Sequence, residues 1–213
     1  GGRVSTDLTY YRKIRRDALI PRVLPPSSAT GVDVRNENIG EVRNTGFEGI
    51  INAQLVDDRR LGWSVTLNGS VNQNRLVTLG GLPPIIGSDT REQEGYPLFG
   101  WWARQIRNVN DANGDGIITI NELTVDDSST FVGSSQPTRE ASLVNSFDIL
   151  NHALRFSALF EYRGGHYLLN DTERIRCQSR SNCRGLTDRT APLDEQARVV
   201  AMREHPMQTR AGF

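Results

Sequence analysis

Five segments of the chain alternate apolar and polar residues with a period of two. This period is typical of β-strands with one apolar and one polar face, because successive side chains of a strand point to opposite faces. The alternation is purest between Trp63 and Asn72 and is broken only by Leu159 in the last segment. The sequence therefore predicts an all-β fold. Strands are expected within residues 4–10, 47–55, 63–72, 141–149 and 154–163.

Short and long connections alternate between these segments. Residues 57–62 and 150–153 form short turns, whereas residues 13–42, 76–140 and 164–213 form long links. A soluble sandwich would also show alternating strands. A transmembrane barrel, however, places long extracellular loops at one end and tight turns at the other. The connection lengths therefore favour part of a large antiparallel transmembrane β-barrel, with the three long links as extracellular loops.

One helix is expected inside the last long link. Residues 193–203 have helical character, and Pro192 suits a first helical turn because it needs no backbone donor there. We expect a short surface helix that packs Ala197, Val200 and Ala201.

Composition narrows the range of functions. The 213 residues are 37% hydrophobic and 23% charged, with 25 basic and 25 acidic side chains. This neutral balance argues against a nucleic acid as partner, since such proteins carry a basic surface. No apolar run approaches the roughly 20 residues of a membrane-spanning helix, and no signal peptide opens the chain. We expect the chain to be an internal piece of a longer polypeptide.

Residues 111–122 read D-A-N-G-D-G-I-I-T-I-N-E and match every position of a calcium loop. Gly116 would make the sharp turn. The flanking residues lack a helical rhythm, so the loop is expected within β-structure, with a structural rather than a sensing role. An acidic surface turn is the plainer alternative, but the full match favours calcium. The predicted ligands are Asp111, Asn113, Asp115, Ile117 through its carbonyl, Thr119 and Glu122.

Four aromatic residues, Tyr96, Phe99, Trp101 and Trp102, precede this loop closely. Tyr96, Trp101 and Trp102 are candidate substrate-binding residues, because a sugar ring or a peptide side chain could stack on such a platform. Two plainer interpretations stay open. The cluster could belong to an aromatic girdle at a membrane interface or form a small core beneath the long loop.

Cys177 and Cys183 are the only cysteines of the chain. Their C-x5-C spacing fits no zinc pattern, so a disulfide closing a small loop on an oxidising cell surface is the expected state. The alternative is a pair of free thiols in a reducing compartment. No motif of a nucleophilic, phosphate-binding or metal-dependent enzyme is present in the sequence. We therefore expect a protein that is not an enzyme.

Residues 38–48 read N-I-G-E-V-R-N-T-G-F-E. This block resembles the N-x-G-E-x-x-N-x-G-F-E block of SusC/RagA-type TonB-dependent outer-membrane transporters. Further matches follow in the family's order over most of the chain. They are Leu67-Asn68-Gly69-Ser70, Gly95-Tyr96-Pro97-Leu98, the calcium loop, Val132-Gly133 with Pro137, and residues 156–164.

The resemblance implies that residues 1–213 are a C-terminal part of a 22-stranded barrel in the outer membrane of a Gram-negative cell. Members of this family import large nutrients, often oligosaccharides or peptides. The implied partners are outer-membrane lipid, a SusD-like surface lipoprotein that acts as a lid, and the TonB complex, which acts through a plug domain absent from this chain.

A second hypothesis is a secreted, calcium-stabilised β-rich domain that binds carbohydrate or protein. The two hypotheses differ in the surroundings of apolar strand residues such as Phe47 and Phe156. These side chains would contact lipid in a transporter and a shared protein core in a secreted domain.

Overall fold

The computed structural model describes residues 2–23, 34–87, 89–151 and 153–204. The chain divides into two compact units. The strand unit comprises Gly1–Pro84, Gln93–Leu98 and Gln136–His166. The loop unit comprises Ile85–Glu92, Phe99–Ser135 and Tyr167–Phe213. Each unit is described by itself below.

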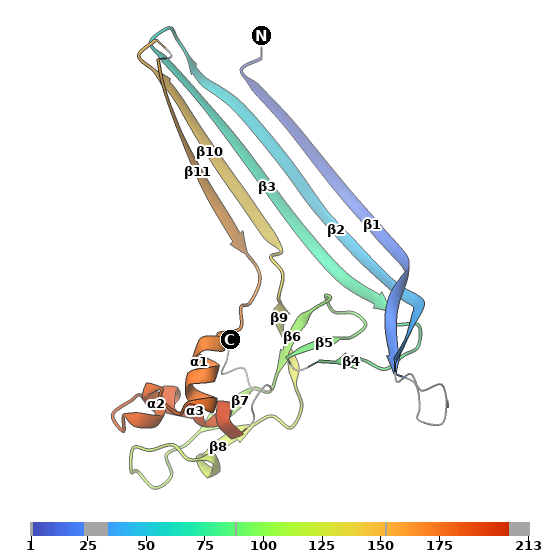
Figure 1. Cartoon of the computed structure of the whole chain (residues 1–213), viewed down its shortest axis with the longest axis vertical. Helices are drawn as coiled ribbons and strands as arrows, with labels where there is room; N and C mark the ends of the chain where they lie inside the picture. The colour runs from blue at the N-terminus through green and yellow to red at the C-terminus, as the bar shows by residue number, and fades with distance from the viewer. Residues whose placement is uncertain (1, 24–33, 88, 152, 205–213) are drawn as a thin grey trace. The chain divides into compact units, whose positions relative to one another are not determined.

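The strand unit is built around one antiparallel sheet of five long strands, in the order β1-β2-β3-β10-β11 (Figure 1). The strands are β1 (Val4–Val23), β2 (Val34–Asp57), β3 (Leu61–Thr78), β10 (Arg139–Ile149) and β11 (Leu154–Gly164). Each predicted strand segment lies within one of them. The prediction of a mostly antiparallel β fold is confirmed.

Tight turns close one end of this sheet. Asp58 and Leu61 exchange backbone hydrogen bonds of 3.0 and 3.2 Å between β2 and β3. Leu150 and Asn151 adopt left-handed backbone conformations, with φ of 54° and 57°, in the turn between β10 and β11. The chain between Thr78 and Arg139 leaves and re-enters the sheet at the opposite end. The sheet thus has a turn end and a loop end, as the connection lengths indicate.

The predicted loop over residues 13–42 is wrong for most of its length. β1 continues to Val23 and β2 begins at Val34, and the two stay paired along this length with register shifts between Arg15 and Leu19. Residues 24–33 of the expected loop lie outside the described residues. The pairing continues although the alternation stops, because the backbone hydrogen bonds of an antiparallel ladder do not require alternating side chains. The link between β3 and β10 also contains short strands, and the segment after Gly164 contains helices.

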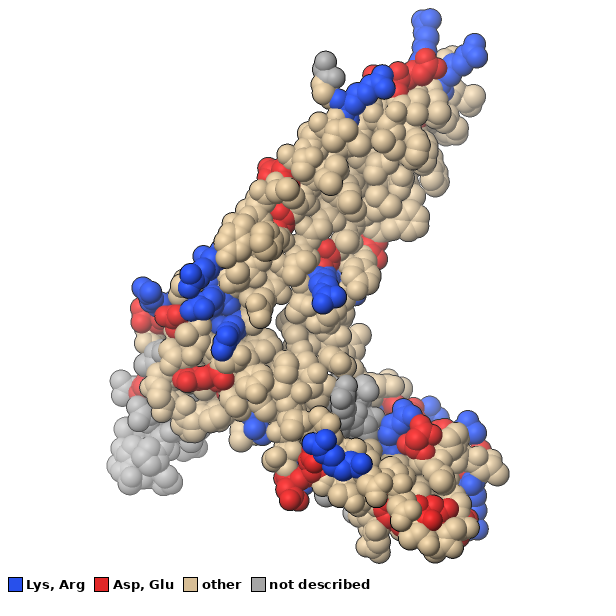
Figure 2. All heavy atoms as spheres, turned by 180° about the vertical axis from the view of Figure 1, so that it is seen from behind, with Lys and Arg blue, Asp and Glu red and all other residues tan. Residues whose placement is uncertain are grey.

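One face of the sheet, the apolar face, carries large hydrophobic side chains that no other described element covers. Leu8 is 78% exposed and Phe47 is 63% exposed. An exposed apolar surface of this extent is unfavourable in water. The exposed members are Val4, Leu8, Tyr10, Phe47, Ile51, Leu67, Val71, Phe156, Phe160 and Tyr162. Figure 2 shows a long, largely uncharged area over the sheet with basic side chains near both ends.

Aromatic pairs mark both ends of the apolar face. Tyr10 and Phe47 are in contact toward the loop end, with ring centroids 4.9 Å apart, in the same register row as Val71. Trp63 stacks on Phe147 toward the turn end at 5.5 Å. The eight residue-to-residue steps from Trp63 to Val71 span about 26 Å of strand at roughly 3.3 Å per step. This length suits the apolar band of a membrane barrel, which is about 25 Å tall and flanked by aromatic girdles.

The opposite face, the polar face, is joined by cross-strand hydrogen bonds between side chains. Thr66 donates to Asn52 at 2.8 Å, Asn68 donates to Ser142 at 3.0 Å, and Ser146 lies 3.2 Å from Ser157. These hydroxyl and amide groups can also form hydrogen bonds with water, whereas an apolar environment would offer them no partners. The sheet therefore separates two different environments, one on each face.

The loop unit contains a four-stranded sheet in the order β4-β5-β6-β9, a β7–β8 hairpin and short helices. Its elements are β4 (Ile85–Ile86), β5 (Thr90–Glu92), β6 (Gly100–Ala103), β7 (Ile106–Val109), η2 (Ile120–Glu122), β8 (Leu123–Val125), β9 (Thr130–Ser134), α1 (Asp171–Arg174), η3 (Ile175–Ser179), α2 (Arg184–Thr187) and α3 (Leu193–Glu204). Within the described residues, none of these helices has the length and apolar character needed to cross a membrane.

Helix α3 is the predicted surface helix, and its first turn follows Pro192 as expected. Ala197 and Ala201 are buried, as predicted. Val200 is only half-buried. Val199 and Met202 instead fill the core beside the two cysteines. The buried face of α3 therefore includes Val199 and Met202 instead of Val200, because this face packs against η3 and α2.

Replacing Leu67 by Arg tests the environment of the apolar face. In a membrane barrel, Leu67→Arg should lower the free energy of unfolding by about 2–4 kcal/mol, because a cation near mid-membrane is costly. The measurement is urea unfolding of the full reading frame folded into lipid vesicles. The matched control is Ser70→Arg on the polar face of the same strand, where the new cation would lie near Glu48 and Glu140. Equal effects of the two substitutions would contradict lipid at this face.

Candidate functional site

The predicted calcium loop joins β7 to β8, and these two strands pair antiparallel with each other. The loop is therefore the tip of a β-hairpin, as its non-helical flanks indicate. Asp111 organises its first half. One carboxylate oxygen accepts the N–H groups of Gly114 at 2.9 Å and Asp115 at 3.2 Å, and the other accepts the N–H of Gly116 at 2.9 Å. Gly114 and Gly116 adopt positive φ angles of 70° and 75°, which glycine alone adopts without strain.

Glu122 closes the second half of the loop. Its carboxylate accepts both the N–H and the hydroxyl of Thr119 at 2.9 Å, and the N–H of Ala112 at 3.2 Å. These hydrogen bonds, above all the one from the Thr119 N–H, lower the pKa of Glu122 below its ordinary value. The side chain is therefore a carboxylate at neutral pH, the form that a divalent cation requires.

The donor set of this loop fits calcium chemically, because Asp111, Asn113, Asp115, Thr119 and Glu122 all offer side-chain oxygens. The carboxylate oxygens of the three acids do not gather within 4.8 Å of one another. They accept backbone hydrogen bonds instead, so the loop already holds its turn. A calcium ion would require a rotation of these side chains toward a common centre, with the Ile117 carbonyl completing the predicted set.

Gln196 of α3 holds this loop, and sequence reasoning missed it. Gln196 is only 3% exposed. Its amide nitrogen donates to the Gly116 carbonyl at 3.0 Å and to the Ala191 carbonyl at 2.9 Å, and its amide oxygen accepts the Ile118 N–H at 3.0 Å. All three contacts are made to backbone groups, which side-chain motifs do not reveal. Buried backbone groups left without such partners would be costly.

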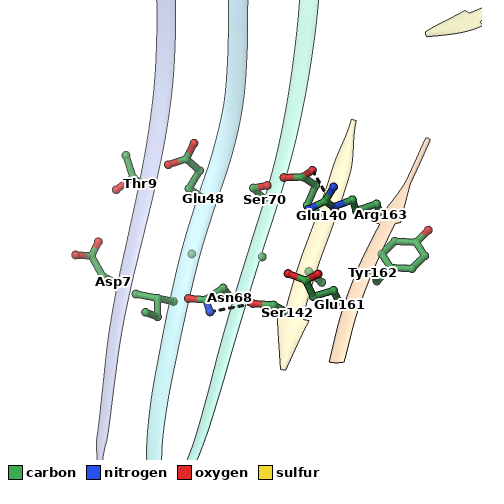
Figure 3. A pocket seen from close by; sticks show the side chains of 14 residues that line it. Asp7, Thr9, Glu48, Asn68, Ser70, Glu140, Ser142, Glu161, Tyr162 and Arg163 are labelled. Atoms are coloured by element: carbon green, nitrogen blue, oxygen red, sulfur yellow. Dashed lines mark hydrogen bonds and ion pairs between the residues drawn. The ribbon is translucent and has the colours of Figure 1, made fainter. Parts of the chain in front are cut away.

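The polar face carries a hollow of about 490 Å³ across all five strands. Figure 3 shows its labelled side chains projecting from β1, β2, β3, β10 and β11. Four carboxylates and one arginine line it, and Arg163 lies 3.8 Å from Glu140. Such a lining can contact polar and cationic groups of a passing solute. The charged members are Asp7, Glu48, Glu140, Glu161 and Arg163.

The candidate aromatic platform is not assembled as one surface. Trp102 is only 8% exposed and packs against Phe131, with ring centroids 5.8 Å apart. The Arg91 guanidinium lies 4.7 Å from the centre of the same ring. Trp102 is therefore part of a small core, and its ring is closed to a ligand. Trp101 donates from its indole to the Tyr167 carbonyl at 2.9 Å.

Tyr96 belongs to the strand unit, whereas Trp101 and Trp102 belong to the loop unit. The Tyr96 backbone carbonyl accepts the Leu76 N–H at 2.8 Å, so this residue lines the edge of β3. The aromatic residues that are candidates for a membrane girdle are Tyr10 with Phe47 and Trp63 with Phe147. Their pairing depends on strand register and cannot be inferred from local sequence.

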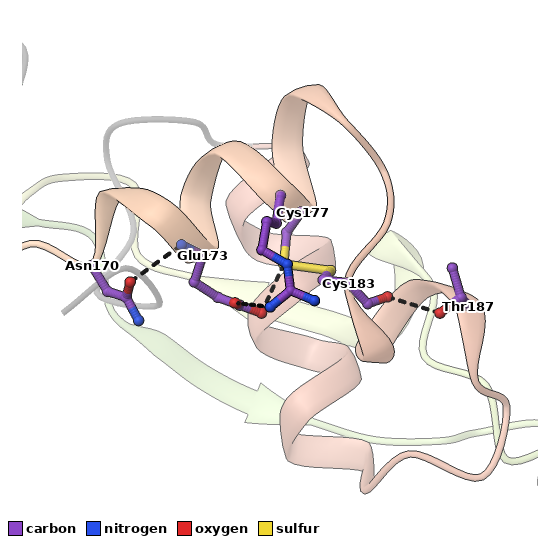
Figure 4. Close-up of a disulfide and its surroundings, with 6 residues drawn as sticks. Asn170, Glu173, Cys177, Cys183 and Thr187 are labelled. Carbon is purple, nitrogen blue, oxygen red and sulfur yellow. Dashed lines mark hydrogen bonds and ion pairs between the residues drawn. A yellow bond between two sulfur atoms is a disulfide. The ribbon is translucent and has the colours of Figure 1, made fainter.

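Cys177 and Cys183 form a disulfide in the structure (Figure 4). Both are fully buried, with Val199 and Met202 completing the core around them. A ligand atom of Glu173 also lies within 4.8 Å of both sulfur atoms. The disulfide leaves no thiolate, so this cluster is a structural crosslink rather than a metal site.

Comparisons with known proteins give concordant results in sequence and in structure. The chain is 27% identical over 200 residues to TonB-dependent receptor P26 of Formosa agariphila, a match that covers 79% of the chain. It is 38% identical over 77 residues to TonB-dependent receptor P3 of the same organism, which covers 36% of the chain. No family model matches the chain.

Solved structures of RagAB share the fold. The RagAB peptide transporter superposes with a TM-score of 0.68 over 83% of this chain at 17% sequence identity. The RagAB peptide importer in its "open-open" state gives 0.63 over 79% at 20% identity. The chain resembles a TonB-dependent receptor. The resemblance predicted from sequence and the β-barrel fold class are thus confirmed.

The TonB-dependent receptors and transporters matched here are longer than this chain. It spans 19% of receptor P26, 8% of receptor P3 and 21% of the chain in the RagAB peptide transporter. Every one of these proteins is named as a receptor, transporter or importer. None of these relatives is named as an enzyme, which agrees with the expectation drawn from the sequence.

Removing two acidic side chains tests the calcium loop. Asp115→Ala combined with Glu122→Ala should leave residues 111–122 sensitive to protease, because the loop loses two predicted ligands and its closing hydrogen bonds. The measurement is limited proteolysis of the full protein in calcium and in chelator. Asp127→Ala, an exposed acid outside the loop, is the matched control. Identical protection of the unmodified protein with and without calcium would exclude the metal.

Replacing Gln196 by Leu tests the connection between α3 and the calcium loop. The side chains have similar volumes, but Gln196→Leu leaves the Ile118 N–H and two carbonyls without partners. Each buried group left unpaired should cost about 1–3 kcal/mol. We expect faster hydrogen–deuterium exchange in residues 111–122 and 193–204, with Gln178→Leu as control. Unchanged exchange at Ile118 would show that this contact contributes nothing.

Proposed function

We propose that this chain forms part of the wall of an outer-membrane barrel through which a TonB-dependent transporter imports large nutrients. The observation that carries the proposal is the contrast between the two faces of one sheet. The apolar face is exposed along its length and ends in aromatic pairs at both ends. The polar face carries hydrogen-bonding side chains and a hollow of about 490 Å³. A barrel wall between lipid and an aqueous passage requires this contrast.

The substrate class follows from the passage and from the relatives. The hollow presents carboxylates beside hydroxyl and amide groups, which suits polar solutes rather than apolar ones. The RagAB structures are those of a peptide transporter and a peptide importer. We therefore infer peptides as the first choice and oligosaccharides as the second.

The two partners inferred from the resemblance belong to the whole transporter. A SusD-like surface lipoprotein would close the passage from outside as a lid. The TonB complex would supply energy through a plug domain. The RagAB importer has been described in "open-open" and "closed-closed" states, which accords with a lid that moves. The loop unit has its own small core and disulfide, and its surface is one that such a partner could contact.

The secreted-domain hypothesis requires a second layer of protein over the apolar face. Among the described residues, no element covers Phe47, Leu67 or Phe160, all of which are exposed. A soluble domain with this surface would aggregate. The structure thus favours the transporter over the secreted domain.

Two neighbouring positions of β11 test the proposal directly. Cells expressing the full reading frame with Ser157→Cys should react with a membrane-impermeant maleimide, because this side chain faces the aqueous passage. Cells with Phe156→Cys should not react, because lipid shields the apolar face. The measurement is the ratio of the two labelling rates. Cys177 and Cys183 are joined in a disulfide, and the unsubstituted protein measures the background labelling.

Uptake provides the matching functional measurement. Cells with the full reading frame should accumulate fluorescent oligopeptides, and deletion of the gene or loss of the proton gradient should abolish this uptake. Equal labelling of the two cysteines would refute the barrel. Correct labelling combined with energised uptake of oligosaccharides but not peptides would retain the barrel and reject only the preferred substrate.

A further inference from the structure

Four arginines lie on the apolar face, on its loop-end side. They are Arg12, Arg43, Arg75 and Arg139, called the arginine set below. Register places Arg139 in the same row as the Tyr10–Phe47 pair, with Val71 between them. The other three lie one or two rows further toward the loop end. They are therefore positioned where the apolar band gives way to the lipid headgroups.

The arginine set concentrates positive charge. Arg43 and Arg75 are directly opposite each other on β2 and β3, and Arg12 lies on the adjoining strand opposite Thr45. Like charges in directly opposed cross-strand positions destabilise a sheet. Basic side chains also gather near this end of the sheet in Figure 2. An anion between the strands would turn this repulsion into attraction.

No carboxylate among the described residues forms an ion pair with any member of the arginine set. Other arginines of the sheet do have such partners: Arg16 lies 3.4 Å from Glu41, and Arg155 lies 2.6 Å from Asp148. The Nε atom of Arg43 is shielded from solvent and has no hydrogen-bond partner in the described part of the chain. A buried donor left unpaired is costly, so an external acceptor would be favourable here.

A groove of about 660 Å³ extends from Arg139, the member of the arginine set nearest the turn end, along the apolar face. Gly49 and Gly69 are paired across β2 and β3 and form its floor. No atom lies within 4 Å of the position that a Cβ of Gly69 would occupy, so the floor is open. Its walls are large apolar side chains, and Arg139 is part of its lining. The walls include Leu8, Tyr10, Phe47, Ile51, Leu67 and Tyr162.

We propose that this surface binds an anionic membrane lipid, with its phosphate on the arginine set and one acyl chain in the groove. This inference rests on the proposed function, because it requires lipid at the apolar face. Guanidinium groups bind phosphate through paired, charge-assisted hydrogen bonds. The groove supplies the apolar contact that a free anion could not use. Charge and shape together thus select a lipid with a negative headgroup.

Lipid-dependent thermal stability measures this site. The full protein in detergent micelles is titrated with phosphatidylglycerol or with phosphatidylcholine of the same acyl chains. Phosphatidylglycerol should raise the unfolding midpoint, and phosphatidylcholine should not. Arg43→Gln combined with Arg75→Gln should weaken the apparent affinity for phosphatidylglycerol about tenfold or more, because charged hydrogen bonds to the phosphate are lost. Arg59→Gln combined with Arg60→Gln, two exposed arginines at the turn end, should leave it unchanged.

Two further measurements separate the parts of the proposal. Gly69→Leu fills the groove and should weaken the effect of phosphatidylglycerol, while inorganic phosphate alone should have no effect. Equal shifts with both lipids, or an equal shift with inorganic phosphate, would overturn the lipid site. If the cysteine labelling of β11 shows the expected contrast, such a result removes the lipid site alone. If the cysteine labelling also lacks the expected contrast, the proposed function itself is refuted, and the lipid site with it.

Discussion

Backbone hydrogen bonding between neighbouring strands is the constraint on which this structure depends. The strand unit has few fully buried hydrophobic side chains, and Val42, Leu76 and Leu79 all lie toward its loop end. Over most of the sheet both faces are open, so side-chain packing cannot fix the register. The backbone hydrogen bonds of the antiparallel ladder fix the register instead. Next to lipid these hydrogen bonds must all form, because each unsatisfied backbone group in hydrocarbon costs several kcal/mol. In a barrel, further strands would complete the ladder at the outer edges of β1 and β11.

Sequence alternation predicted the strands correctly where two different environments meet. Between Val4 and Tyr10, or between Trp63 and Val71, one face must be apolar and the other polar, so the period of two is visible. Beyond Lys13 and before Val42 the same strands continue without that contrast. Their side chains carry no period-two signal there, and the sequence was interpreted as a loop. The period-two alternation therefore reports the environment of each face of a strand rather than the presence of the strand itself.

The hairpin loop with the predicted calcium ligands could be located from sequence because its candidate ligands lie within twelve residues. Gln196 could not, since it reaches the loop from 80 residues away and binds only backbone groups. The Tyr10–Phe47 pair and the Arg43–Arg75 pair depend on register in the same way. The cluster around Trp102 shows the opposite error. Aromatic residues adjacent in sequence suggested one binding surface, but successive residues of a strand point to opposite faces, and Trp102 is buried in a small core.

The hydrogen bonds of the Gln196 amide limit how far two long insertions, residues 76–140 and residues 164–204, can vary in length. Residues 76–140 carry the hairpin tip, and residues 164–204 carry α3, yet each completes the hydrogen bonding of the other. Shortening either insertion would leave buried polar groups without partners in the segment that remains. Relatives built on this plan should therefore keep both insertions or lose both, even though a barrel wall alone would permit either to be trimmed separately.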